Sequence, residues 1–227
     1  MLLVIDAGNT NVVFALFKDQ TLVARWRIKT LAGRTADEYQ SFLLPLMALE
    51  NIKWDDVHSV LLSSVVPAEN FNLMRFCERH VGKTPVSIND KRIDLGVKID
   101  LPHPETLGAD RLANAIAAKH LYKSPCVVID FGTGTTFDVL DEKGIYVGGI
   151  IASGVHLSLE ALHRVSAKLP NIDIKRPDKV CANDTVSAMQ SGIFYGYLSM
   201  IDGLVQRLEA ERGAFSAVIA TGGLAPL

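Results

Sequence analysis

The chain has 227 residues, 48% of them hydrophobic, and a formal net charge of −2 at pH 7. This composition supplies enough apolar surface for one or two folded domains. The scattered Lys and Arg residues form no basic block able to neutralise many phosphates, and no apolar run reaches the length of a membrane span, so we expect neither a nucleic acid nor a membrane as a partner.

The first residues and the cysteines bear on the location of the protein. The apolar run at residues 1–5 ends at Asp6 and is too short for a signal peptide. The three cysteines, Cys77, Cys126 and Cys181, are odd in number and never spaced as CxxC. This usage favours reduced thiols over disulfides or a zinc site. We therefore expect a cytoplasmic protein.

Residues 2–17 predict a β-hairpin with a polar turn. Four apolar residues run into Asp6, and a second apolar stretch follows at residues 12–17. Gly8 lets the backbone approach a nucleotide, and Thr10 adds a hydroxyl beside the amide groups of the turn. Asp6, at the end of a buried strand, is suited to hold Mg²⁺. An ordinary structural turn is the alternative interpretation.

The next elements are a helix and a strand. Thr35 and Glu38 have the spacing of a capping box, which predicts that a helix begins there. Pro45 is expected to kink this helix or to end it early. The β-branched run at residues 59–66 ends at Pro67 and predicts a buried strand.

A second helix is predicted to begin at the tetrad Gly108-Ala109-Asp110-Arg111. Asp110 near a helix N-terminus is favoured as a carboxylate and can accept the proton of an attacking hydroxyl. Arg111 can pair with a substrate carboxylate or a phosphoryl group. The alternative is a capping Asp beside a solvated Arg. The residues expected to share one face of this helix are Ala113, Ile116, Ala117 and Leu121.

A second hairpin repeats the first, with Asp130 placed 124 positions after Asp6. Residues 126–129 are apolar, residues 130–136 contain two glycines and three hydroxyls, and a second mostly apolar stretch follows at residues 137–140. Two such turns favour a pair of phosphate-binding turns over two structural hairpins. We expect two homologous α/β halves, residues 1–121 and 122–227, with a ligand cleft between them.

Three further elements are predicted in the second half. Residues 146–151 indicate a strand, residues 158–164 a short helix, and a helix begins at Asp184 and extends to about Arg212. A strand at residues 217–220 leads to Gly222-Gly223, a turn that either contacts an adenosine or simply ends the strand. A stripe of small residues in the long helix indicates either close packing within the chain or a dimer interface, and its members are Gly192, Gly196, Ser199 and Gly203.

Together these motifs resemble the actin-like ATPase superfamily, and within it the type III pantothenate kinases. The specific parts are the Gly108–Arg111 tetrad and the run Thr-Val-Ser-Ala-Met-Gln-Ser-Gly that begins at Thr185; Gly148-Gly149 also matches, and the resemblance covers essentially the whole chain. It implies two ribonuclease H-like domains and the ATP-dependent phosphorylation of pantothenate to 4′-phosphopantothenate, the first step of coenzyme A biosynthesis. The alternatives are another small-metabolite kinase of the superfamily, or a non-catalytic regulatory homologue.

The resemblance also implies roles for individual residues. Those implied to bind ATP are Asp6, Ala7, Gly8, Asn9, Thr10, Asn11, Val12, Val13 and Thr133. Those implied to contact pantothenate are Gly108, Ala109, Asp110, Arg111 and Thr185. Asp110 would be the general base, Asp6 would place Mg²⁺, and Asp130 would bind a monovalent cation, potassium or ammonium. The family is also expected to act as a homodimer.

Three features depart from the pattern of the family. The chain has Ala152-Ser153-Gly154 where the family often has Pro-Gly, and Leu101 where many members have an aromatic residue. We expect both changes to affect the pantothenate pocket rather than the phosphate site. The third is that Leu227 falls where further elements are expected, so the second domain is predicted to be incomplete at its C-terminus.

Overall fold

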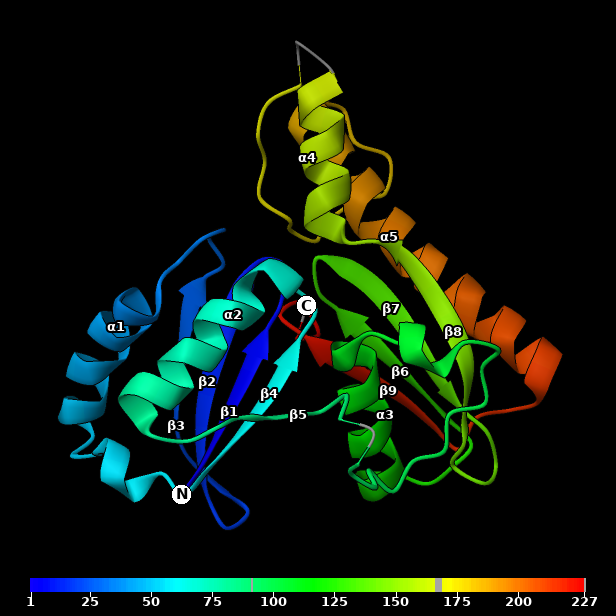
Figure 1. The fold of residues 1–227 in the computed structure, drawn as a ribbon. Helices are drawn as coiled ribbons and strands as arrows, with labels where there is room; N and C mark the ends of the chain where they lie inside the picture. Colours follow the sequence, from blue (N-terminus) through cyan, green and yellow to red (C-terminus); the bar gives the residue numbers. More distant parts are fainter. Residues whose placement is uncertain (91, 166–168, 227) are drawn as a thin grey trace. The chain divides into compact units, whose positions relative to one another are not determined.

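The computed structural model describes residues 1–90, 92–165 and 169–226, which form two compact units (Figure 1). Unit 1 comprises Met1–Gly96 and Pro102–Ile116, and unit 2 comprises Val97–Leu101 and Ala117–Leu227. Each unit contains one mixed β-sheet with helices packed on it. The expectation of an α/β fold is therefore confirmed.

The sheet of unit 1 has the strand order β3-β2-β1-β4-β5. Its strands are β1 (Leu2–Ala7), β2 (Asn11–Lys18), β3 (Thr21–Lys29), β4 (Ser59–Ser64) and β5 (Val86–Ser87). Strands β1 and β2 are antiparallel, whereas β4 runs parallel to β1 on its other side. The predicted first hairpin is confirmed, and its first strand is hydrogen-bonded along both edges.

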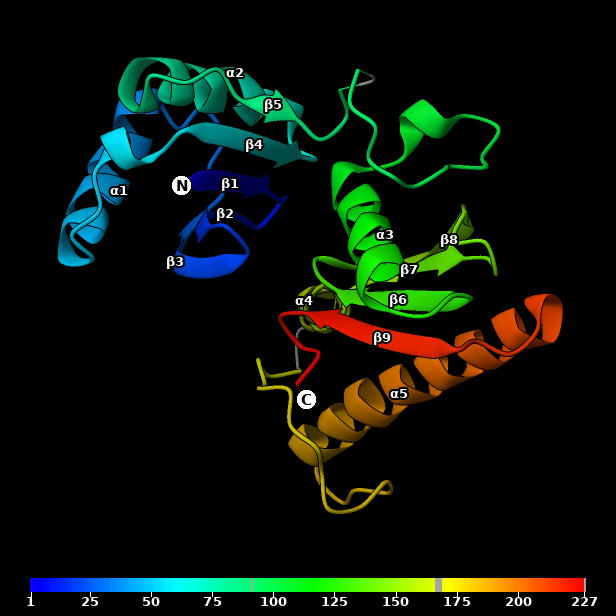
Figure 2. The same ribbon diagram turned by 90° about the horizontal axis from the view of Figure 1, so that it is seen from below.

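Two helices, α1 (Ala36–Leu49) and α2 (Pro67–Phe76), cover one face of this sheet (Figure 2). Between them and the sheet the rings of Phe14, Tyr39 and Phe76 contact one another, with centroids 5.7 to 6.1 Å apart. All three residues are fully buried. Such edge-to-face and tilted aromatic contacts add to the stabilisation from buried apolar area. Short helical turns follow at Trp54–Asp56, Cys77–Val81 and Pro104–Thr106.

Helix α1 begins as predicted but does not end early. The Thr35 hydroxyl accepts the Glu38 backbone N–H at 3.3 Å, and the Glu38 carboxylate accepts the Thr35 N–H at 2.8 Å, which completes the capping box. The helix continues through Pro45 to its last residue, Leu49. Leu43 and Met47 on either side of the proline are buried in the core. Their burial outweighs the roughly 3 kcal/mol that an internal proline costs a helix.

The sheet of unit 2 has the strand order β8-β7-β6-β9. Its strands are β6 (Cys126–Phe131), β7 (Gly134–Leu140), β8 (Tyr146–Ser153) and β9 (Ala217–Gly222). Strand β6 pairs antiparallel with β7 and parallel with β9, so the predicted second hairpin is confirmed. Strands β8-β7-β6-β9 have the same order and directions as β3-β2-β1-β4 of unit 1.

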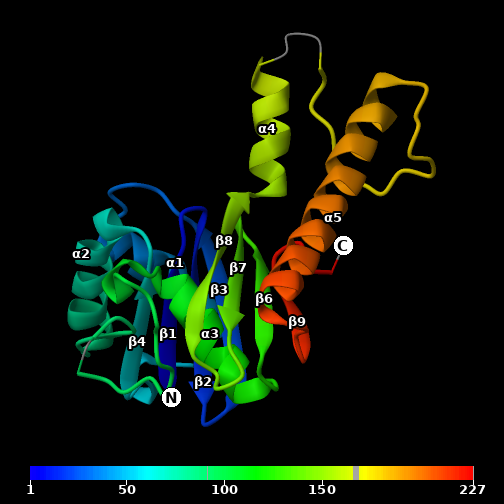
Figure 3. The same ribbon diagram turned by 90° about the vertical axis from the view of Figure 1, so that its right-hand side faces the viewer.

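Helix α5 (Thr185–Arg212) runs along one face of the unit 2 sheet, where Leu204 and Leu208 join a core that contains Phe137 (Figure 3). Helix α4 (Val155–Val165) follows directly after β8. The predicted extent of α5 is confirmed. Within the described ranges, no helix combines the length and the hydropathy needed to cross a membrane.

Helix α3 (Ala109–Leu121) begins at the predicted tetrad, but it buries a different face from the one expected. The residues buried after its first turn include Leu112, Ala115 and Ala118, whereas Leu121 is 69% exposed. Alanines stand on both faces of this helix, so periodicity alone could not identify the buried one. The four residues expected to share a face, Ala113, Ile116, Ala117 and Leu121, are therefore not the ones that α3 buries most deeply.

Candidate functional site

The first turn (residues 8–10) is held by backbone and side-chain hydrogen bonds. The Gly8 N–H donates to the Asn11 carbonyl at 3.0 Å. From the end of β3, the Thr30 hydroxyl donates to the Gly8 carbonyl at 2.7 Å, and the Thr30 N–H donates to the Thr10 carbonyl at 2.9 Å. These bonds fix the backbone conformation of the turn. Thr30 carries no local sequence signal for this role, because its partners lie 20 or more positions away.

Asp6 lies directly before the last residue of β1 and is exposed, although its neighbours Ile5 and Ala7 are buried. The Ser63 hydroxyl on β4 donates to Asp6 Oδ1 at 3.2 Å, and the two residues are register partners. The pairing of β1 with β2 and β4 therefore holds the carboxylate next to the first turn. A single carboxylate fits Mg²⁺ in a kinase, where phosphates and waters supply the other ligands.

The tetrad spans the start of α3. Asp110 lies in the first turn of the helix, and its Oδ1 accepts the Arg111 N–H at 2.8 Å. A Cβ atom at Gly108 would lie 2.5 Å from the same oxygen, so a side chain there would displace the carboxylate. Ala109 is buried and anchors the turn. The carboxylate is thus held in the first turn of the helix.

The second turn (residues 132–133) is closed by the Gly132 N–H, which donates to the Gly134 carbonyl at 3.0 Å. The end of β8 then lies directly against it, because the Gly154 N–H donates to the Thr133 carbonyl at 3.2 Å. A Cβ atom at Gly154 would overlap with that carbonyl oxygen. Gly154, the last residue of the Ala152–Gly154 departure from the family pattern, therefore contacts the second turn.

The turn after β9 lies against Asp130. Strands β9 and β6 pair in parallel, with Thr221 opposite Asp130 and Gly222 opposite Phe131. A Cβ atom at Gly222 would lie 2.6 Å from Asp130 Oδ1, and the φ angle of Gly222 is +92°, a conformation that favours glycine. The Gly223 N–H donates to the Phe131 carbonyl at 3.2 Å. The structure thus brings the second hairpin and the Gly-Gly turn together.

Thr185, the remaining predicted contact of pantothenate, is the first residue of α5 and is exposed. Its position is set by Asp184, which caps the helix and accepts the Ser187 backbone N–H at 2.9 Å. This backbone hydrogen bond lowers the pKa of the Asp184 carboxyl from its ordinary value. Negative charge is favoured there, because the helix N-terminus carries partial positive charge.

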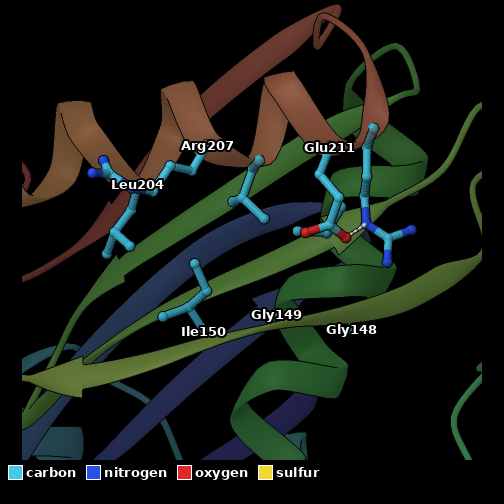
Figure 4. Close-up of a pocket in the computed structure, with 9 residues that line it drawn as sticks. Gly148, Gly149, Ile150, Leu204, Arg207 and Glu211 are labelled. Carbon is cyan, nitrogen blue, oxygen red and sulfur yellow. Dashed lines mark ion pairs between the residues drawn. The ribbon is translucent and has the colours of Figure 1, made fainter.

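A pocket of about 290 Å³ lies between α5 and the unit 2 sheet (Figure 4). Gly148 and Gly149 of β8 line it, and Leu204 points towards Ile150 across it. An exposed ion pair between Arg212 and the adjacent Glu211, 3.4 Å apart, lies at its rim. None of the residues predicted to bind ATP or pantothenate lines this pocket, so it is not the predicted site.

The predicted residues form two sets of similar construction, one in each unit. In unit 1, Asp6 lies next to the end of a doubly paired strand and precedes a glycine turn. In unit 2, Asp130 has the same position relative to its sheet and turn. A carboxylate beside a turn rich in N–H and hydroxyl groups is suited to hold a phosphate together with a cation.

Comparison with known proteins identifies relatives over the whole chain. A sequence model of a family described as type III pantothenate kinase matches residues 2–207. The type III pantothenate kinase of Rhodospirillum rubrum is 52% identical over 227 residues, which cover 100% of this chain and 88% of the relative. That of Paramagnetospirillum magneticum is 51% identical over 100% of this chain and 87% of the relative.

Solved structures of lower sequence similarity share the fold. A Baf family transcriptional activator from Campylobacter jejuni is 18% identical, with a TM-score of 0.55, and the match covers 96% of this chain and 90% of that chain. A 2-dehydro-3-deoxygalactonokinase from Sinorhizobium meliloti is 12% identical with the same TM-score, and the match covers 98% and 91%. These similarities support the actin-like ATPase fold.

We predict that Gly222→Ala weakens the binding of an ATP analogue, whereas Gly223→Ala does not. An added methyl group at residue 222 would strain a positive φ angle and press on the Asp130 carboxylate, while residue 223 has open space around its Cβ position. We expect a loss of about tenfold in affinity for Gly222→Ala and less than about twofold for Gly223→Ala by titration calorimetry. An equal loss of affinity in the two variants would contradict the assignment of the turn after β9 to the ATP site.

Proposed function

Because this chain belongs to the type III pantothenate kinase family and catalyses the ATP-dependent phosphorylation of pantothenate to 4′-phosphopantothenate in coenzyme A biosynthesis, we propose which of its residues bind each substrate and cation and which one acts as the general base. The observation that carries this proposal is the repeated construction of a carboxylate beside a glycine turn in both units. The relatives match the chain along its full length.

We propose that residues 6–13 and Thr133 bind ATP. The bonds from Thr30 to the first turn and from Gly154 to the second support this, because they fix the turns before ATP arrives. Donors held in place cost no reorganisation at the moment of reaction. Asp6 would hold Mg²⁺, which neutralises the charge that develops on the phosphates.

Pantothenate is the acceptor, and we propose that Asp110 is the general base. The carboxylate takes the proton of the primary hydroxyl as its oxygen attacks the γ-phosphorus and ADP leaves. Arg111 pairs with a negatively charged group of the substrate, and Thr185 adds a hydroxyl contact. The fixed position of Asp110 at the start of α3 supports this role. Most of the rate enhancement then comes from alignment and charge neutralisation.

Asp130 would bind the monovalent cation, potassium or ammonium. A hard cation needs oxygen ligands, and Gly222 leaves room for the Asp130 carboxylate at the end of β6. Carbonyl oxygens of the neighbouring turns are of the same chemical kind. The cation would supply a fixed positive charge beside the second turn.

A homodimer is supported by the small residues of α5. Cβ atoms added at Gly192 and Gly196 would meet nothing within 4 Å, so contacts within this chain do not require glycine there. Each glycine inside a helix costs roughly 0.5–1 kcal/mol. Apolar side chains nearby in sequence or in the sheet are exposed, with Leu198 at 45% and Ile151 at 71%. Close approach of a second copy explains both features.

We predict that Asp110→Asn lowers kcat for pantothenate phosphorylation by about 10² to 10⁴, the range expected for loss of a general base. Asparagine keeps an Oδ1 that can accept the Arg111 N–H, so the fold is retained. The assay couples ADP release to the appearance of 4′-phosphopantothenate, with the wild type as reference. Full turnover by the variant would remove Asp110 from this role, and a wild type inactive on pantothenate would refute the assignment of the substrate.

The two metal assignments predict that each substitution changes the requirement for one cation and not for the other. Asp130→Ala should raise the potassium concentration needed for half-maximal activity by about tenfold and leave the Mg²⁺ requirement close to that of the wild type. Asp6→Asn should raise the Mg²⁺ concentration needed for half-maximal activity and leave the potassium requirement close to that of the wild type. The measurement is the initial rate while one cation is varied and the other is saturating. The same shift in both titrations for both variants would exclude separate cation sites.

For the dimer, we predict that Gly196→Leu gives monomers, whereas Ala210→Leu does not. Both positions are exposed on α5, but only residue 196 belongs to the stripe of small residues. A leucine there would hold two helices apart. Size-exclusion chromatography with light scattering reports the mass of each variant. A wild type that is monomeric at micromolar concentration would contradict the homodimer.

A further inference from the structure

Glu69 of α2 is a fully buried acid, with 0% of its surface exposed. Burying a carboxylate is unfavourable unless hydrogen bonds replace water. Glu69 Oε1 accepts the Gly33 N–H at 3.0 Å, and Oε2 accepts the Tyr39 hydroxyl at 2.9 Å. One donor therefore comes from the loop between β3 and α1 (residues 30–35), and the other from α1.

That loop has little burial of its own. Leu31 is 50% exposed, and both Ala32 and Gly33 are exposed, so apolar packing does not hold this part of the loop in place. Its internal bonds are few, with the Arg34 N–H donating to the Leu31 carbonyl at 3.2 Å. The bond from Gly33 to Glu69 is thus a main attachment of the loop to the rest of unit 1.

The hydrogen bond from Tyr39 holds Glu69 in the position where it accepts the Gly33 N–H. Burial, followed by the hydrogen bond to Glu69, raises the pKa of the Tyr39 hydroxyl, so the hydroxyl stays a donor throughout the neutral range. The Arg34 guanidinium lies 5.7 Å from the centre of the Tyr39 ring, and its Nη2 donates to the Lys29 carbonyl at 3.2 Å. This stacking brings positive charge towards the buried acid.

The loop begins at Thr30, which donates to two carbonyls of the first turn, those of Gly8 and Thr10. Only two residues separate Thr30 from Gly33, so a displacement of Gly33 is transmitted to Thr30 through a short length of chain. A continuous path of bonds therefore joins Glu69 to the turn proposed to bind ATP.

We propose that Glu69 is a positioning residue for ATP: it fastens the loop of residues 30–35 to α2 and so holds Thr30 against the first turn. This inference rests on the proposed function in one respect, that residues 6–13 bind ATP. Glu69 itself touches neither substrate. Loss of Glu69 lowers the affinity for ATP, because the nucleotide must then order the first turn when the nucleotide binds.

The test compares two substitutions at residue 69. Glu69→Met removes both acceptors at similar side-chain length. Glu69→Gln keeps them satisfied, because its amide oxygen accepts the Gly33 N–H and its NH₂ donates to the Tyr39 oxygen. We expect Glu69→Met to raise KM for ATP by about tenfold, the effect of one hydrogen bond to a charged group, and to leave KM for pantothenate within about twofold. Glu69→Gln should restore KM for ATP to within about threefold of the wild type.

The matched control is Gln40→Leu, which removes the Gln40 Oε1 acceptor of Trp54 Nε1, 2.9 Å away. This bond also joins α1 to another part of unit 1, but it has no connection to the loop of residues 30–35. We expect Gln40→Leu to lower the melting temperature and to leave KM for ATP unchanged. Hydrogen exchange of residues 31–34 should be faster in Glu69→Met than in the control.

The outcomes separate this inference from the proposed function. A change in melting temperature for Glu69→Met without a change in KM for ATP, or an equal change in Gln40→Leu, would overturn the positioning role. Should Glu69→Met fail to fold, Tyr39→Phe removes one of the two donors to Glu69. It should then raise KM for ATP by a smaller factor. A wild type inactive on pantothenate tests the function alone, because binding of an ATP analogue and hydrogen exchange still report on Glu69.

Discussion

The pairing of one strand along both of its edges is the constraint on which the proposed site depends. Strand β1 is bonded to β2 and β4, and β6 is bonded to β7 and β9. A strand bonded on both sides cannot shift its register without breaking two ladders. The backbone hydrogen bonds of these ladders therefore place Asp6 and Asp130 at the ends of their strands. Each turn begins from a fixed point.

The two units use the same strand order but hold their turns differently. The first turn is held by Thr30, whose hydroxyl donates to the Gly8 carbonyl and whose backbone N–H donates to the Thr10 carbonyl. The second is held by close backbone contact, which Gly154 and Gly222 allow because a Cβ atom at either position would overlap with neighbouring atoms. Thr30 begins the loop of residues 30–35, so the position of that loop can influence the first turn. This difference explains why a remote acid such as Glu69 can affect one turn and not the other.

A kinase of this kind works mainly by alignment and charge. Phosphoryl transfer demands little covalent chemistry from the protein, so each residue contributes to the rate mainly through its position relative to the reacting groups. Asp110 is held by the first turn of α3 and by the absence of a side chain at Gly108. The fold therefore contributes to catalysis through the same contacts that stabilise it.

The sequence alone determined the features that depend on neighbours along the chain. Both hairpins, the capping box at Thr35 and the family motifs were recognisable because periodicity and short motifs act over a few residues. The tertiary structure decided the rest. Helix α1 continues through Pro45 because core packing outweighs a local preference, and the roles of Thr30, Gly222 and Glu69 depend on partners many positions away. Such contacts arise only when the chain folds, since no local pattern records which distant atoms will meet.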